Sequence, residues 1–85
     1  MAYWVYILQS ETSGHYYVGQ THNLADRLAR HNTGRTGATR GRGPWRLVYS
    51  EEYPTRQAAM ARERQLKAHK RRAYLAALIA ARPVG

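Results

Sequence analysis

Five residues have side chains suited to chemistry on a phosphodiester. Tyr6 and Tyr17 lie in two short segments near the start of the chain, Arg27 and His31 follow in a helix-like stretch, and Glu63 lies far downstream among alanines and arginines. A phenol or an imidazole can transfer protons, a guanidinium can bind phosphate, and a carboxylate can hold a hard cation. Together these residue types indicate metal-assisted cleavage of a phosphodiester bond.

Two strands are needed to bring the tyrosines together. Aromatic and β-branched residues predict strands over Tyr3–Gln9 and Tyr16–Thr21, and the short turn between them fits a β-hairpin. Alternation places Tyr6 on one face of the first strand and its neighbours Val5 and Ile7 on the other. On antiparallel neighbours, the two tyrosine side chains are therefore expected to converge.

A helix is predicted over Leu24–Asn32, ending at Gly34. Asn23 is a good N-cap, and Leu24 and Leu28 should face the core. Arg27 and His31 are four residues apart, so they are neighbours on one flank of this helix, close to the end of the second strand. The helix thus adds a cation and an imidazole to the tyrosine face.

The segment Gly34–Trp45 alternates glycine with arginine and is predicted to be a loop that contacts phosphate. A third strand follows over Arg46–Tyr53, with Val48 on one face and alternate side chains on the other. Those alternate side chains are Leu47, Tyr49 and Tyr53. Trp45 is expected in the core rather than as a platform for a base.

Two helices complete the predicted fold. The first opens at Pro54-Thr55 and carries a stripe that faces the sheet, and the second runs from about Arg71 to Ala81. The stripe comprises Ala59, Met60, Glu63, Leu66 and Lys67, and the second helix buries Tyr74, Leu75, Leu78 and Ile79. The order ββαβαα predicts one α+β domain over residues 1–85, with a three-stranded, mainly antiparallel sheet flanked by helices.

The amino-acid composition limits the kinds of partner to be expected. The chain has 85 residues and a formal charge of +9, and 12 of its 14 basic residues are arginine, the side chain that binds phosphate in a bidentate manner. A polyanion is the expected partner, and a membrane surface is not. The chain has no cysteine, and no apolar stretch long enough for a signal peptide or a membrane span, so a cytoplasmic location is the default expectation.

Five ordered segments resemble the GIY-YIG nuclease superfamily. They are Val5-Tyr6-Ile7, Tyr17-Val18-Gly19, the run from Gln20 to Asn32 with Arg27 and His31, Gly41-Arg42-Gly43-Pro44-Trp45, and the stretch from Ala59 to Lys67 with Glu63. The resemblance covers nearly the whole chain. It is greatest to the small single-domain, UPF0213-like members and to the catalytic subunit of structure-specific nucleases of the same type.

The resemblance implies a role for each residue of the set. Tyr6 would be the general base or would position the attacking water, and Tyr17 would hold water or phosphate. Arg27 would bind the scissile phosphate, and His31 would hydrogen-bond Tyr6 or relay its proton. Glu63 would hold one Mg²⁺ or Mn²⁺ that keeps several water ligands.

Several residues are expected to contact nucleic acid. They are Gly19, Thr21, Asn32, Arg35, Arg40, Arg42 and Lys67, with Thr39 as a further candidate. Gly19 should allow close approach of substrate or of the next helix. For Glu63 the alternative is a simple ion pair with Arg27 or Lys67. His15, His22 and His69 lack the spacing of a metal site.

The chain departs from the family pattern at the first tripeptide, where Val5 replaces glycine, and at Val18, which replaces isoleucine. Neither change removes a tyrosine. The leading hypothesis is a metal-dependent DNA endonuclease that recognises structure rather than sequence, acting alone, with a protein partner or as a homodimer. The alternatives are a non-catalytic module that binds DNA or RNA and an accessory protein of structured RNA.

Overall fold

The computed structural model describes residues 2–34, 37, 41–68 and 72–81. Three strands and three helices follow in the order β1 (Tyr3–Ser10), β2 (Tyr16–Thr21), α1 (Leu24–Asn32), β3 (Trp45–Tyr53), α2 (Arg56–Ala68) and α3 (Arg72–Ala81). The predicted ββαβαα order and the α+β class are confirmed.

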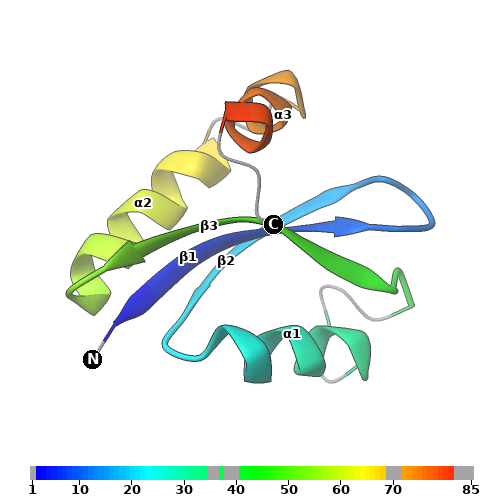
Figure 1. The fold of residues 1–85 in the computed structure, drawn as a ribbon, viewed down its shortest axis with the longest axis horizontal. Helices are drawn as coiled ribbons and strands as arrows, with labels where there is room; N and C mark the ends of the chain where they lie inside the picture. Colours follow the sequence, from blue (N-terminus) through cyan, green and yellow to red (C-terminus); the bar gives the residue numbers. More distant parts are fainter. Residues whose placement is uncertain (1, 35–36, 38–40, 69–71, 82–85) are drawn as a thin grey trace.

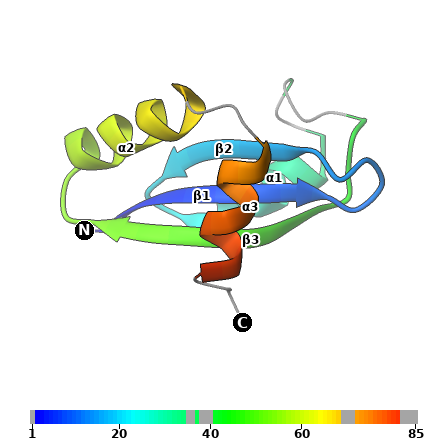
Figure 2. The same cartoon turned by 90° about the horizontal axis from the view of Figure 1, so that it is seen from above.

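The sheet has the strand order β2-β1-β3, and both pairings are antiparallel. α1 lies on one face of this sheet, whereas α2 and α3 lie on the other (Figure 1). Seen from above, α2 runs on the β2 side and α3 crosses over the strands (Figure 2). None of the helices in the described part of the chain is both long and apolar enough to cross a membrane.

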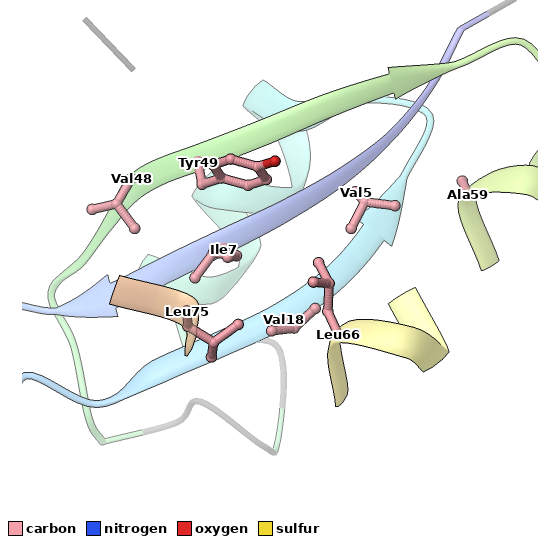
Figure 3. Packing of buried hydrophobic residues seen from close by; sticks show 8 residues of the cluster. All are labelled: Val5, Ile7, Val18, Val48, Tyr49, Ala59, Leu66 and Leu75. Atoms are coloured by element: carbon pink, nitrogen blue, oxygen red, sulfur yellow. The ribbon is translucent and has the colours of Figure 1, made fainter. Parts of the chain in front are cut away.

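Alternation along β1 divides the buried side chains between the two faces. Val5 and Ile7 lie in the larger cluster beneath α2 and α3, together with Ala59, Leu66 and Leu75 (Figure 3). The smaller cluster, on the α1 face, consists of Tyr6, Leu8 and Trp45, with Leu24 and Leu28 of α1 packed against it. The predicted faces of β1, the inward pair of α1 and the buried tryptophan are confirmed.

The predicted faces of β3 are partly wrong. Ile7 pairs with Tyr49 but Leu8 pairs with Leu47, so the register shifts between these rows at a β-bulge. Strict alternation fails there, and Val48 and Tyr49 both lie beneath the helices α2 and α3 (Figure 3), while Leu47 packs in the α1 cluster.

The inward stripe of α2 is also narrower than predicted. Ala59 and Leu66 are fully buried, but Met60 is 43% exposed. The side chain of Glu63 is 20% exposed and that of Lys67 is 49% exposed. α2 contacts the sheet along a narrow apolar line, so the flanking positions lie at the rim of the interface.

Candidate active site

Tyr6 and Tyr17 come from adjacent strands and lie close together. Tyr6 pairs with Gly19 across the β1–β2 ladder, and Tyr17 pairs with Leu8. The tyrosine rings are therefore diagonal neighbours, with centroids 6.5 Å apart. The expectation that the two side chains converge is confirmed.

Gly19 makes room for Tyr6. A Cβ atom on residue 19 would lie 2.5 Å from Tyr6 Oη and 2.6 Å from Tyr6 Cζ. The atoms that approach this glycine most closely are therefore those of Tyr6 and not those of the next helix, and approach of substrate stays a prediction.

α1 places His31 beside the two tyrosines. Asn23 caps the helix by accepting a hydrogen bond of 3.1 Å from the Asp26 amide. His31 is only 2% exposed, and its Nε2 lies 3.0 Å from Tyr6 Oη. Its ring centroid is 4.9 Å from that of Tyr17. Two buried rings, Tyr6 and His31, and the half-buried ring of Tyr17 thus form a cluster between α1 and the sheet.

Both partners of this hydrogen bond are held in their neutral forms near pH 7. Burial and, next, the phenol of Tyr17 raise the pKa of Tyr6, against the opposing effect of Arg27. Burial and then the charge of Arg27 lower the pKa of His31. In a neutral pair, either atom can donate the proton, according to the tautomer of the imidazole.

Arg27 brings a positive charge to the cluster, and one of its donors is unpartnered. Its Nε is buried and makes no hydrogen bond. A buried guanidinium N–H without an acceptor is costly, and an anion bound there would remove that cost. The donor is thus suited to a phosphate oxygen.

Glu63 lies on α2, on the opposite side of the sheet from α1 (Figure 1). Its Oε2 is 3.1 Å from Lys67 Nζ, four residues further along the helix. Burial and the Tyr17 phenol are the larger causes of the raised pKa of Tyr6, and the charge of Glu63 is the smallest, so the carboxylate acts on the tyrosine cluster only weakly. Of the two ion pairs considered from the sequence, the one with Lys67 is present.

The donor set restricts how a metal could be held. Within the described residues, no group of three or more histidine, aspartate or glutamate side chains is placed to share a cation. Glu63 offers hard carboxylate oxygens, which fit an ion such as Mg²⁺ that takes most of its ligands from water and phosphate. The residues present are compatible with such an ion, provided that the ion pair between Lys67 and Glu63 opens to free the carboxylate.

Three residues expected to contact nucleic acid have internal partners. Asn32 brackets the backbone of Trp45, donating to its carbonyl at 3.0 Å and accepting from its amide at 2.6 Å. Thr21 is 4% exposed and its hydroxyl bonds to the backbone of Asn23. Gly19 is covered by Tyr6.

The remaining members of that set differ in position. Arg42 is exposed, and Lys67 lies beside Glu63. Arg35, Thr39 and Arg40 lie outside the described residues. Substrate contact by any of these residues stays a prediction.

The sequence reasoning missed a polar cluster on the face beneath α2 and α3. Glu51 is 9% exposed and accepts hydrogen bonds from Arg62 at 2.9 and 3.1 Å, from Tyr53 at 2.7 Å and from Tyr49. Burial raises the pKa of Glu51, but these hydrogen bonds outweigh it and hold the pKa at about 2. The spacing Tyr49-x-Glu51-x-Tyr53, which puts all three on one face, was the available signal.

The chain belongs to the GIY-YIG family, whose catalytic-domain model matches residues 2–75. This is a nuclease-type family.

The chain is similar to proteins named UPF0213. It is 38% identical over 73 residues to UPF0213 protein BH0048 of Halalkalibacterium halodurans, covering 85% of this chain and 77% of that protein. It is 44% identical over 66 residues to UPF0213 protein CPE1444 of Clostridium perfringens, covering 75% and 69%. The solution NMR structure of BH0048 superimposes with a TM-score of 0.61 at 34% identity, covering 98% of this chain and 87% of that one.

Proposed function

We propose that this protein is a metal-dependent endonuclease that hydrolyses DNA phosphodiester bonds and recognises the structure of the nucleic acid rather than its sequence. The observation that carries the proposal is the buried contact of 3.0 Å between Tyr6 Oη and His31 Nε2. A phenol joined to a neutral imidazole, within range of a guanidinium with an unpartnered donor, is a complete proton-transfer and phosphate-binding set.

In this proposal Tyr6 is the base for the attacking water, and His31 accepts the proton that the Tyr6 phenol releases. Because burial raises the pKa of Tyr6, the phenol is protonated near pH 7 and can accept a proton from water only as it releases its own. With the imidazole proton on Nδ1, Nε2 of His31 accepts the phenol proton while Oη takes the proton from the attacking water. The result is an imidazolium and a restored phenol.

Arg27 links that proton transfer to substrate binding. Burial and, next, the charge of Arg27 lower the pKa of His31 in the free protein, which disfavours the imidazolium. A phosphate bound to the guanidinium offsets that charge, so the imidazole becomes a better proton acceptor when substrate is present. Tyr17, next to both rings, would hold the water or a phosphate oxygen.

Glu63 would hold Mg²⁺ or Mn²⁺, and a bound ion of this kind polarises the phosphate and neutralises the leaving oxygen. Preference for shape follows from the kind of contact that the chain offers. A net charge of +9 and exposed arginines bind phosphates, which fix position but carry no sequence information.

The test is cleavage of a labelled panel of single-stranded, duplex, nicked, flapped and branched DNA, together with RNA, with Mg²⁺ or Mn²⁺. We expect metal-dependent products from the wild type and a loss of about 100-fold or more in Glu63→Gln. Glu52→Gln is the matched control, because Glu52 is an exposed glutamate of β3. Equal cleavage by the wild type and Glu63→Gln would overturn the assignment of the metal ligand.

A second candidate is a non-catalytic module that binds DNA or RNA. The ion pair between Glu63 and Lys67 favours it, because the only carboxylate assigned to the metal already has a cationic partner. Binding that weakens steeply with salt, without products from any member of the panel, would select this function.

A further inference from the structure

A shallow hollow opens at the outer edge of β2, next to the candidate active site. Its volume is about 240 Å³, and its lining comes from three elements that are separate in the sequence. β2 contributes Tyr16, Tyr17 and Val18, α2 contributes Leu66 and Lys67, and α3 contributes Leu75. We call it the edge hollow. Pockets for drug-sized molecules start at about 300 Å³, so its size suits a single ring system.

The edge hollow shares two residues with the candidate active site. The Tyr17 ring, whose centroid is 4.9 Å from that of His31, forms part of its wall. Lys67, which also lines it, pairs with Glu63 and has its Nζ 5.9 Å from the centre of the Tyr17 ring. A group seated in the hollow would therefore lie beside the phosphate that the proposed chemistry cleaves.

The chemistry of the lining favours one kind of ring. Tyr16 and Tyr17 supply aromatic surface, and Val18, Leu66 and Leu75 supply aliphatic surface. Cations lie at both tyrosines, because Arg72 stands over the Tyr16 ring at 5.0 Å and Lys67 over that of Tyr17. Aromatic rings beside cations are the pattern by which proteins bind bases of single strands while neutralising the adjoining phosphates.

We infer that the edge hollow is a subsite for one unpaired nucleobase of the substrate strand, next to the scissile phosphate. A base within a duplex is paired and stacked, so it can enter only after extrusion, whereas an unpaired base enters without that cost. The subsite would therefore direct the protein to nucleic acids with a gap, flap, loop or free end. This inference rests on the proposed function and names the feature of the substrate that it recognises.

Binding without divalent metal tests the subsite apart from cleavage. DNA with a single-stranded gap, carrying the fluorescent base 2-aminopurine at successive positions, is titrated with the full chain in the presence of EDTA. We expect a fluorescence change at one position, and binding about tenfold tighter than that of an intact duplex of the same length. An abasic nucleotide at that position should abolish the preference without altering the protein.

Tyr16→Ala should lose the preference for gapped DNA, and Tyr16→Phe should keep it because the ring remains. Tyr3→Ala is the matched control, since Tyr3 also lies under an arginine, Arg56, at 5.5 Å, but does not line the hollow. Equal binding of gapped, abasic and duplex DNA by the wild type would overturn the subsite, even if Mg²⁺-dependent cleavage is observed. A base-dependent signal without cleavage would support the subsite and overturn the nuclease proposal.

Discussion

Gly19 and Tyr6 fit together so closely that no side chain can occupy position 19 while Tyr6 stays in place. The Cβ atom of an alanine there would lie 2.5 Å from Tyr6 Oη, and Tyr6 itself is only 2% exposed. Position 19 thus controls the position of the phenol that contacts His31.

Gly19→Ala should displace the phenol and break its hydrogen bond to His31. We expect a loss of about 1 to 3 kcal/mol in the free energy of unfolding, because the buried ring must move into a packed interior. Cleavage should fall by about 100-fold, because the base is misplaced. Urea unfolding and initial rates measure the two effects.

Gly37→Ala is the control for stability, because a Cβ on residue 37 meets no atom of the described residues within 4 Å. A Gly19→Ala protein as stable and as active as the wild type would show that the phenol position is not fixed by this contact.

Arg27→Ala should reduce cleavage by about 100-fold or more, because it removes the donor assigned to the phosphate. Arg30→Ala, on the same helix, is the matched control. The Arg30 side chain is 51% exposed and paired with Asp26 at 3.0 Å, so its removal should change the rate only a few-fold. Comparable losses in both variants would indicate a general effect of charge rather than a specific phosphate contact.

The pKa of His31 should lie below its ordinary value in the folded protein, and NMR titration of its ring protons measures it. Arg27→Ala should raise this pKa, but not to that ordinary value, because burial is the larger cause. A pKa for His31 at or above that of an exposed histidine would contradict the buried environment.

The lowered pKa of His31 also predicts how stability depends on pH. An unfolded histidine binds its proton near pH 6.5, whereas the folded one binds it only at lower pH. The unfolded state therefore holds more protons between these two values, and the free energy of unfolding should fall as the pH drops below about 6.5. His31→Gln should show a flatter dependence in this range, measured by urea unfolding against pH.

Glu51→Gln should destabilise the fold by about 3 to 5 kcal/mol near pH 7, because it leaves Arg62 without its buried anionic partner. The folded pKa of about 2 lies below the ordinary value of 4.5. The stabilisation by Glu51 is thus complete above about pH 4.5 and is lost as the pH falls towards 2. Thermal unfolding at pH 7 and pH 2.5 should show a smaller difference between the two proteins at the lower pH.

Glu52→Gln, the exposed neighbour, should be nearly neutral at both pH values. If the wild type and Glu51→Gln were equally stable at pH 7, the cluster would have no net stabilising effect.

Patterns within single strands and helices predicted which face of their own element several candidate site residues occupy. The period of two in β1 placed Tyr6 correctly, and the i,i+4 spacing on α1 placed Arg27 and His31 on one flank. Pairing between distant strands was not accessible in the same way. The bulge at Ile7 and Leu8 depends on how β1 meets β3, so the predicted faces of two β3 residues, Leu47 and Val48, are exchanged relative to Tyr49.

Several hydrogen bonds and ion pairs between residues far apart in the sequence were also not predicted. Asn32 was expected to contact substrate, yet its amide bonds to the backbone of Trp45. No role was predicted for Glu51, although it forms an ion pair with Arg62 of α2. Such pairs depend on the packing of two elements, and their residue types alone do not show which of several acids and arginines meet.

The strand order gives the sheet two outer edges, and both carry features that oppose pairing with another chain. β3, at one edge, has exposed Arg46 and Glu52. α2 runs on the side of β2 at the other edge (Figure 2) and carries Lys67 there. Charged side chains are a common protection of edge strands. The protein should therefore resist strand-mediated aggregation at the concentrations that structural work requires.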